Sequence, residues 1–595
     1  MKPPFFLRYI ILGSLLGVMS ISILIQMMRI QGSQTASELR AQAKLYSGEM
    51  EKNFPERGSI YDRWGHLLAG NEQVYEIGAD LQSVKDPQTI AATLNRVLGT
   101  DFAQALASAS IPYVEGKSAY AVLDDFISAE KVQELIKLRD EYAREAAATS
   151  KNGKKAPSLQ GLMFTAHLKR SYPEGNLASN VLGFYSYLDR DKGRGYFGVE
   201  EKYNDLLAGT PQTVWVPFDP YDVKQIPDVP AGSSLILTID REAQSVVEGI
   251  LDDAIKATTS DSGTIIVMDP NNGEILAMAT TPRLDPNKYW DYGKVFPNST
   301  PFNRAISQTF EPGSVFKVLT MAGALDSNTV KPTTPFFDNG VYMIGGGYIH
   351  NWDGGAWGQQ DMTGCMQHSL NVCLAWVADQ LGPTKFYDYI RAFGIGHLTG
   401  VDLAGEAVYP LRLPGDGQWF PVDLGTNSFG QGLATTPIQL MMATSAVANG
   451  TGKMVAPHIL RAMVDNNRQY DTTPQFVGQP ISPETAKTET EMLTTSLKLE
   501  SSIALVPGYT VAGKTGTAEI ATPTGYSTDL TNASFIGWGP VKNPRFLIYV
   551  WLEKPRTSKW GSVVASPVFS QVFSRLAVLE NIPPDSPFTT PEATQ

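Results

Sequence analysis

The chain has 595 residues, too many for one ordinary hydrophobic core, so roughly two or three domains are expected. Its 43% hydrophobic and 18% charged residues exclude wholesale disorder, and a net charge of −12 without long basic runs argues against nucleic acid as a partner. Two cysteines exclude a multi-disulfide framework, and six scattered histidines lack metal-site spacing, so no metal and no cofactor are predicted.

The N-terminal segment is the first predicted element. Tyr9 to Met28 is almost free of charge, and about 20 such residues span a hydrocarbon core of about 30 Å. Lys2 and Arg8 precede it, which predicts a cytoplasmic tail (1–8), a transmembrane anchor (9–28) and an exported body. A cleaved signal peptide is the alternative, but the nearest small-residue site, Ala41-Gln42-Ala43, lies too far downstream. We see no second apolar run of this length, which predicts a single-pass protein.

The next region, residues 29–230, begins with a polar juxtamembrane helix around Ser37 to Lys44. A pattern of short strands and turns then begins at Arg57. We expect Arg57, Asp62 and Arg63 to form either a local ion-pair network or a solvated turn. Residues 85–150 are expected to be rich in helix, because apolar residues recur there at helical spacing.

Pro227 to Gly232 marks the boundary of a second large domain, residues 231–580, before a flexible tail at 581–595. A strand at 234–239, a helix at 241–258 and a hairpin of strands at 264–268 and 275–279 follow. This order predicts an α+β protein with an antiparallel sheet flanked by helices.

Ser314 is the candidate nucleophile. Pro312 and Gly313 break the chain before an apolar helix from Val315 to Leu325, so Ser314 lies at a helix start. Lys317, three residues on, shares its face, and its amine can reach the Ser314 hydroxyl. Serine needs an adjacent base, and burial can depress a lysine pKa enough for it to serve as that base. On this motif alone, an ordinary helix cap remains the simpler interpretation.

Two further short motifs become meaningful only in combination with the first. Ser369 and Asn371 lie two residues apart, so both can face one side of an extended or looped segment. The segment around Lys514, Thr515, Gly516 and Thr517 is typical of an edge strand to which an extended peptide can add. The lysine and the threonine hydroxyls would bind a carboxylate there.

The ordered set S-x-x-K, S-x-N and K-T-G resembles the motifs of penicillin-recognising serine enzymes. The chain is similar to class B penicillin-binding proteins, which are peptidoglycan D,D-transpeptidases, over nearly its whole length. Further matching stretches are 57–63 with Gly65, 195–200, 349–353, 428–432 and 436–439. The context Glu311-Pro312-Gly313-Ser314 resembles the division and sporulation branch more than the elongation branch.

The resemblance implies a role for each motif residue. Ser314 would attack the penultimate D-alanine of a stem peptide, with Lys317 as general base, and terminal D-alanine would leave. Ser369 and Asn371 would move a proton and position the donor, while Lys514 and Thr515 would hold its carboxylate. The backbone N–H groups of Ser314 and Thr517 would form the oxyanion hole.

The resemblance also implies location and partners. Residues 29–230 would contain a pedestal, or dimerisation-type, domain, and the catalytic domain would lie on the outer face of the bacterial cytoplasmic membrane. Its partners would be lipid-linked or nascent peptidoglycan, β-lactams, and a polytopic membrane glycosyltransferase of the shape, elongation, division or sporulation type. The alternatives are a β-lactam sensor or β-lactamase-like hydrolase, and a non-catalytic scaffold that activates a glycosyltransferase.

Cys365 and Cys373 flank the second motif, and an exported protein can pair its cysteines. Eight residues along one helix would place them about 12 Å apart, which is too far for a disulfide. The sequence therefore favours two free thiols, because a bond would need a break in the helix near Ser369.

Overall fold

The computed structural model describes residues 5–39, 48–149, 156–187, 193–217, 229–500, 502–522 and 525–585. The chain divides into two compact units, Met1–Glu56 with Ala208–Gly232, and Arg57–Leu207 with Ser233–Gln595. Residues 57–207 thus share a unit with the C-terminal region. The sequence pattern instead placed them in a separate region, 29–230, before the domain at 231–580.

The first unit contains α1 (Phe5–Gln31), which is long and apolar enough to cross a membrane and has exposed side chains. It also contains an antiparallel pair of strands, β1 (Gly48–Asn53) and β8 (Gln212–Pro217). The predicted juxtamembrane helix is helical up to residue 39, and its remainder lies outside the described residues. The predicted tail is described only as far as residue 585.

A second segment, Gly561–Leu579, also has the length and apolarity of a membrane span, which the sequence interpretation overlooked. It forms α19 (Gly561–Val564) and α20 (Ser566–Leu579), and half of it is buried. Val572 and Phe573 are fully buried in one of the hydrophobic clusters, which identifies α20 as a core helix. Only α1 is left as a candidate membrane anchor among the described helices.

The second unit begins with a sheet in the order β18-β17-β9-β2-β3-β4, with β5 also paired to β3. Its strands are β2 (Ile60–Tyr61), β3 (Leu67–Asp80), β4 (Tyr120–Ser128), β5 (Leu162–Ser171), β9 (Ser234–Leu237), β17 (Leu460–Asp465) and β18 (Arg468–Asp471). β2 pairs with β9, so strands from both predicted domains share one sheet. This shared sheet explains why residues 57–207 belong to the same unit as the C-terminal region.

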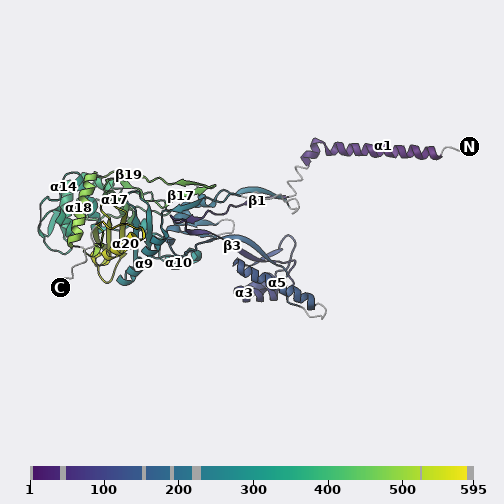
Figure 1. Ribbon diagram of the computed structural model, residues 1–595, viewed down its shortest axis with the longest axis horizontal. Helices are drawn as coiled ribbons and strands as arrows, with labels where there is room; N and C mark the ends of the chain where they lie inside the picture. Colours follow the sequence, from purple (N-terminus) through teal and green to yellow (C-terminus); the bar gives the residue numbers. More distant parts are fainter. Residues whose placement is uncertain are drawn as a thin grey trace. The chain divides into compact units, whose positions relative to one another are not determined.

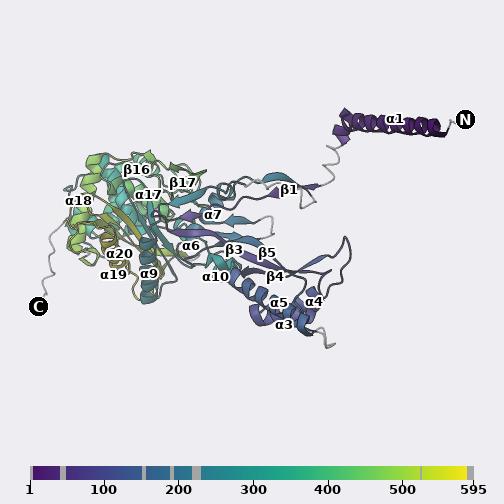
Figure 2. The same cartoon turned by 45° about the vertical axis from the view of Figure 1, so that its right-hand side comes forward.

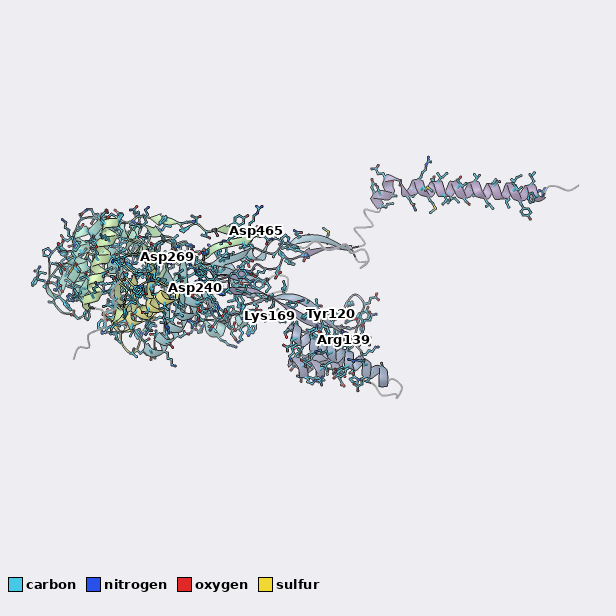
Figure 3. All side chains as sticks on the ribbon, viewed as in Figure 1. Tyr120, Arg139, Lys169, Asp240, Asp269 and Asp465 are labelled. Carbon is cyan, nitrogen blue, oxygen red and sulfur yellow. A yellow bond between two sulfur atoms is a disulfide. The ribbon has the colours of Figure 1, made fainter. Side chains whose placement is uncertain are left out.

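Three helices cover one end of the long strands β3, β4 and β5 (Figure 2). They are α3 (Pro87–Leu98), α4 (Phe102–Ala109) and α5 (Ala129–Thr149), and they confirm the helix-rich segment. Leu94 on α3, Leu135 on α5 and Ile77 on β3 are fully buried in the cluster between them. Tyr120 on β4 and Arg139 on α5 lie in this part of the unit (Figure 3).

Arg57 forms a buried ion-pair network with residues far away in the chain. It donates hydrogen bonds to Glu200 on α7 (Gly198–Lys202), which also accepts a 2.8 Å bond from the buried Arg170 and a 3.0 Å bond from the Tyr172 hydroxyl. Burial opposes ionisation of Glu200, but the charges of Arg170 and Arg57 outweigh it and hold the pKa of Glu200 below its usual value.

The local ion-pair network predicted for residues 57–63 is therefore wrong. Asp62 instead bonds His66 at 3.0 Å and accepts the backbone N–H of Arg241, while Arg63 approaches Glu274 at 3.4 Å. His66 is a local partner of Asp62, but Arg241 and Glu274 lie more than a hundred residues away and cannot be read from local spacing.

Replacing Glu200 by glutamine is expected to destabilise the second unit by about 3–5 kcal/mol, because it leaves buried guanidinium charges without a carboxylate. The urea midpoint, followed by tryptophan fluorescence, measures the loss. Glu242→Gln is the matched control, since the Glu242 side chain is 62% exposed beside Arg241 and contributes about 0–1 kcal/mol. Equal midpoints for both variants would contradict a structural role for the network.

The catalytic sheet has the order β11-β10-β22-β21-β20, and all neighbouring strands are antiparallel. The strands are β10 (Ser262–Met268), β11 (Ile275–Thr280), β20 (Ala512–Thr522), β21 (Gly525–Gly539) and β22 (Phe546–Glu553). On β10, Ile265 and Val267 belong to one cluster and Ile266 and Met268 to another, because alternate side chains point to opposite faces.

Helices cover both faces of this sheet, as the sequence predicts. α9 (Arg241–Thr258) and α20 pack together on one face, where they lie side by side (Figure 1). α12 (Lys317–Asp326), α14 (Asn371–Leu381) and α17 (Pro437–Ala448) contribute to the cluster on the other face. α9 has the predicted bounds, and its N-cap Asp240 accepts the backbone N–H of Ala243 at 2.9 Å.

Candidate active site

Ser314 lies in a short 3₁₀ turn, Gly313–Phe316, that leads directly into α12. The sequence predicted a helix from Val315 to Leu325 with Ser314 at its start. The α-helix instead begins at Lys317, and Ser314, half-buried, lies on the 3₁₀ turn before it. Gly313 has a φ of +62° and donates its N–H to the carbonyl of Gly430 at 3.0 Å. A Cβ atom on Gly430 would lie 2.3 Å from the Gly313 oxygen, so glycine at 430 is required to hold this turn.

Lys317 is fully buried, and its amine points into the second motif. Its Nζ donates to the Ser369 carbonyl at 2.6 Å, to the Ser369 hydroxyl at 3.2 Å and to the Asn371 side-chain oxygen at 2.8 Å. No hydrogen bond between described residues joins this amine to the Ser314 hydroxyl, so the predicted direct contact is not formed here. The structure nevertheless brings Lys317 into contact with two residues that lie more than fifty positions further along the chain.

The pKa of Lys317 lies well below the ordinary lysine value. Burial is the largest cause, and the nearby positive charge of Lys514 lowers the pKa further. A larger fraction of the amine is therefore unprotonated near neutral pH, as a general base requires.

Ser369 lies between α13 (Met362–Gln367) and α14, in the left-handed region with a φ of +54°. Its hydroxyl accepts from Lys317 and, at 2.9 Å, from Lys514. One oxygen thus connects the two amines. This arrangement is suited to moving a proton between the Lys317 side and the Lys514 side of the site.

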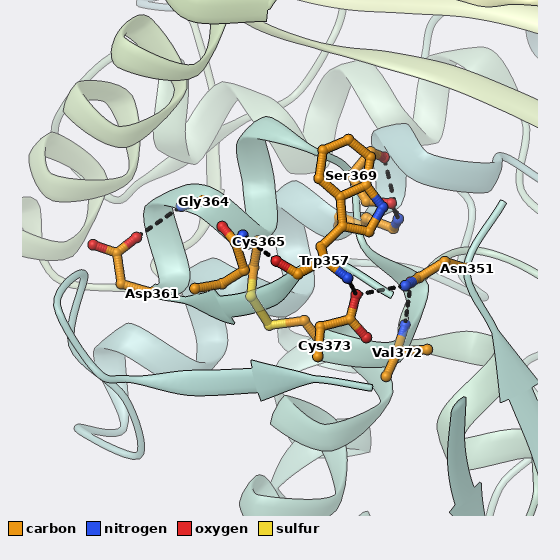
Figure 4. The surroundings of a disulfide bond; sticks show 11 residues. Asn351, Trp357, Asp361, Gly364, Cys365, Ser369, Val372 and Cys373 are labelled. Atoms are coloured by element: carbon orange, nitrogen blue, oxygen red, sulfur yellow. Dashed lines mark hydrogen bonds between the residues drawn. A yellow bond between two sulfur atoms is a disulfide. The ribbon is translucent and has the colours of Figure 1, made fainter. Parts of the chain in front are cut away.

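Cys365 and Cys373 form a disulfide, with their Cα atoms 6.0 Å apart. The expectation of free thiols was wrong, because it assumed a continuous helix. The left-handed residue Ser369 breaks that helix and folds α14 back towards α13, which brings the two cysteines together. Figure 4 shows the cross-link beside the segment that carries Ser369.

The third motif lies on β20, which is an edge strand, as predicted. Lys514 is almost fully buried and donates to Thr515 as well as to Ser369. A Cβ atom on Gly516 would lie 2.2 Å from the Ser534 hydroxyl on β21 and 2.9 Å from the Val315 side chain, so this glycine lets both β21 and the turn that carries Ser314 approach β20 closely. The Thr517 hydroxyl accepts the N–H of Gly561 at 3.0 Å.

The same packing places the Ser314 turn directly against β20. A Cβ atom on Gly313 would lie 2.9 Å from the Ala518 Cβ and 3.2 Å from the Thr517 carbonyl oxygen. Ser314 and Thr517, whose backbone N–H groups are the predicted oxyanion donors, therefore lie in adjoining segments.

Supporting residues escaped the sequence interpretation, although the stretch 349–353 was noted as a match. The carbonyl of His350 accepts the Asn371 amide at 3.2 Å, and the Asn351 side chain accepts the N–H of Val372 at 3.2 Å. The Trp352 indole donates to the carbonyl of His368 at 3.0 Å. Together they fix both ends of the Ser369–Asn371 segment.

Glu311 is a further missed residue, near the start of the Ser314 turn. Its carboxylate accepts the N–H of Gly432 and the hydroxyl of Tyr526, both at 3.0 Å. Burial raises the pKa of Glu311. The motif context suggested only its branch of the family, whereas the contacts show that it connects three separate segments around the site.

The arrangement as a whole suits acyl transfer through a serine. It combines a hydroxyl on a helix-start turn, a buried amine of lowered pKa, a hydroxyl between two amines and a cationic edge strand. No group of three or more His, Cys, Asp or Glu side chains within the described ranges is arranged to hold a metal ion.

Comparisons with known proteins point to the same chemistry. The penicillin-binding protein transpeptidase domain matches residues 263–574, more than half of the chain, and the penicillin-binding protein dimerisation domain matches residues 52–222. Stage V sporulation protein D of Bacillus subtilis is 32% identical over 536 residues, which are 87% of this chain and 77% of that protein. Peptidoglycan D,D-transpeptidase FtsI of Escherichia coli is 29% identical over 548 residues, covering 89% of this chain and 84% of FtsI.

Solved structures show the same fold. Penicillin-binding protein 3 of Mycobacterium tuberculosis, complexed with aztreonam, has a TM-score of 0.66 at 25% identity and covers 91% of this chain and 99% of its own. Penicillin-binding protein 2X of Streptococcus thermophilus has a TM-score of 0.73 at 21% identity, covering 90% of this chain and 81% of its own. The sporulation relative agrees with the predicted branch. The chain therefore belongs to the class B penicillin-binding proteins.

Proposed function

We propose that this protein is a membrane-anchored peptidoglycan D,D-transpeptidase that cross-links stem peptides through an acyl-enzyme on Ser314. The observation that carries the proposal is the contact of the Ser369 hydroxyl with both Lys317 and Lys514, beside the turn that presents Ser314. A scaffold without catalysis would not need a fully buried lysine whose pKa is lowered at this point, because burying an amine without a role is unfavourable.

In the proposed acylation step, the Ser314 oxygen attacks the carbonyl of the penultimate D-alanine, and unprotonated Lys317 accepts the serine proton. The backbone N–H groups of Ser314 and Thr517 stabilise the oxyanion. Ser369 passes a proton towards the leaving nitrogen, the C–N bond breaks, and D-alanine departs. An amine from a second stem peptide then attacks the ester, forms the cross-link and restores the Ser314 hydroxyl.

Substrate positioning falls to the edge strand and the second motif. An extended donor peptide adds to β20, where Lys514 and Thr515 hold its terminal carboxylate. Gly516 lets the strand pack against the Ser314 turn, and Asn371 orients the donor amide. The proposed reaction needs no metal or cofactor.

We also propose the topology and partners that the sequence suggested. Residues 1–8 are cytoplasmic, 9–28 cross the membrane, 29–230 contain the pedestal, 231–580 form the transpeptidase domain and 581–595 form a tail. The catalytic domain faces the outside, where lipid-linked and nascent peptidoglycan are found. A polytopic membrane glycosyltransferase would contact the anchor and the pedestal region.

Fluorescent penicillin tests this function against the hydrolase and scaffold alternatives. The protein is expected to be labelled at Ser314 and to release the hydrolysed antibiotic slowly, because β-lactams resemble the D-Ala-D-Ala end and trap the acyl-enzyme. Rapid, repeated release would identify a hydrolase. A natural protein that takes no label at all would support the scaffold.

Lys514→Ala is expected to weaken binding of carboxylate-bearing donors and to slow acylation. The variant loses a charge-assisted hydrogen bond worth about 1.5–3 kcal/mol, which corresponds to roughly 10- to 100-fold in kcat/KM. It also removes a positive charge beside Lys317, so the pKa of Lys317 rises and acylation needs a higher pH. Acylation rates across pH measure both effects, and an unchanged rate would refute the role of Lys514.

A further inference from the structure

The disulfide Cys365–Cys373 encloses the turn that carries Ser369. Cys365 lies on α13 and Cys373 on the first turn of α14, and both are fully buried. Leu370 donates its N–H to the Cys365 carbonyl at 3.0 Å, so the enclosed segment is also tied to α13 through the backbone. The cross-link thus encloses Ser369 and Asn371, the two residues of this segment that take part in the proposed acylation step.

The shape of this turn determines where the base Lys317 finds its partners. One of its three hydrogen bonds goes to the backbone carbonyl of Ser369, and the other two go to the side chains of Ser369 and Asn371. A rotation of the Ser369 backbone would move all three acceptors. Side-chain packing alone therefore cannot preserve the Lys317 environment if the turn relaxes.

The turn also contains a residue in an intrinsically disfavoured backbone conformation. Ser369 has a φ of +54°, which disfavours a residue with a Cβ atom by roughly 1–2 kcal/mol. A continuous helix through residues 362–381 would remove this strain and would place Cys365 and Cys373 about 12 Å apart. The cross-link, with a Cα separation of 6.0 Å, is incompatible with that helix.

We propose that the Cys365–Cys373 disulfide is a positioning element that holds Ser369 and Asn371 around Lys317, so that the protein acylates efficiently only in the oxidised form. This inference rests on the proposed function, because it assigns the cysteines a role in the same acylation step. A small dithiol would abolish the effect: it gives two electrons and two protons to the S–S bond, forms two cysteine thiols and becomes a cyclic disulfide itself.

The charged surroundings of Lys317 define what the cross-link changes. Lys514 on β20 lowers its pKa, and the ring of Phe429 lies 6.0 Å from its amine. On α18 (Pro483–Glu500), which packs against α12, Glu489 is fully buried, and burial raises its pKa well above the usual value.

The other helices around α12 add few charges. α17 carries no charged residue, and α14 carries Asp379. Tyr389 on α15 (Pro383–Ala392) bonds Asp326 at the far end of α12. A loosened turn would admit water to Lys317 and leave these groups in place.

The test compares the full-length parent with Cys365→Ala/Cys373→Ala, using the rate of penicillin acylation across pH. Without the cross-link, the pKa of Lys317 should rise towards its ordinary value as the turn opens. The acid limb of the profile should then move up by about one pH unit, and acylation near neutral pH should fall about tenfold. Val572→Ala is the matched control, since Val572 is fully buried on α20 in the cluster on the opposite face of the sheet; its profile should not move.

A second arm keeps the natural sequence. The parent is reduced with dithiothreitol in mild urea, because both sulfurs are buried, and is assayed after the urea is removed, then again after reoxidation. The reduced protein should behave like the double variant, and reoxidation should restore the rate. Unchanged or faster acylation would overturn the proposal. A slower rate without a shift of the pH profile would also overturn it, because that result indicates only a destabilised protein. If the parent is not acylated at all, the proposed function itself is contradicted. If the parent and the double variant are acylated at the same rate, only the role of the disulfide is contradicted.

Discussion

Ser314→Ala is expected to abolish penicillin labelling and to reduce transpeptidation by at least about 10⁴-fold, because no other step can proceed without the nucleophile. Ser314 lies on the turn before α12, next to the edge strand β20, and its loss removes only one oxygen from a half-buried position. The fold should therefore persist. Gel fluorescence after labelling and D-alanine release from a stem pentapeptide measure the two activities.

Ser327→Ala is the matched control for this variant. Ser327 caps the other end of α12 and donates to the carbonyl of Ala324 at 3.1 Å, away from the three motifs. It should label normally. Strong labelling of the Ser314 variant would assign the nucleophile to another residue and would remove the basis of the proposed mechanism.

Lys317→Met is expected to slow acylation by about 10²–10⁴-fold, the usual contribution of a general base. Methionine nearly fills the buried volume of the lysine, so the loss reports the amine rather than packing. In the parent, acylation should rise with pH as Lys317 loses its proton and should fall below its pKa, which burial and Lys514 place below the ordinary lysine value. In the variant, this fall of the rate at low pH, the acid limb of the profile, should disappear.

The control for the base is Lys294→Met. The Lys294 side chain is 82% exposed and pairs with Asp291 on the surface, so its removal should change neither the rate nor the profile. A variant at 317 that retains the parental acid limb would show that another group accepts the serine proton.

The sequence predicted those parts of the site that depend on local spacing. Ser314 and Lys317 lie one helical turn apart, and residues around Lys514 have the composition of a strand, so both motifs were placed on the right kind of element. The helix at 241–258 was predicted with its observed bounds, because its apolar spacing and its N-cap agree. The edge position of β20 and the helices on both faces of the sheet also follow the prediction.

The parts that sequence alone did not reveal depend on tertiary contacts. The disulfide required a left-handed Ser369, a conformation that local propensity disfavours. The ion pair between Arg57 and Glu200 joins positions 143 residues apart, and the hydrogen bond of Glu311 to Gly432 joins positions 121 apart. No periodic pattern encodes such pairs, and only the folded chain brings them together.

Mapping the acyl group tests the assignment of Ser314 as nucleophile most directly. After brief reaction with penicillin, the full-length protein is digested, and mass spectrometry locates the adduct among its peptides. A single adduct is expected on Ser314, stable long enough to be isolated. An adduct on Ser369 or on another residue, with Ser314 unmodified, would contradict that assignment.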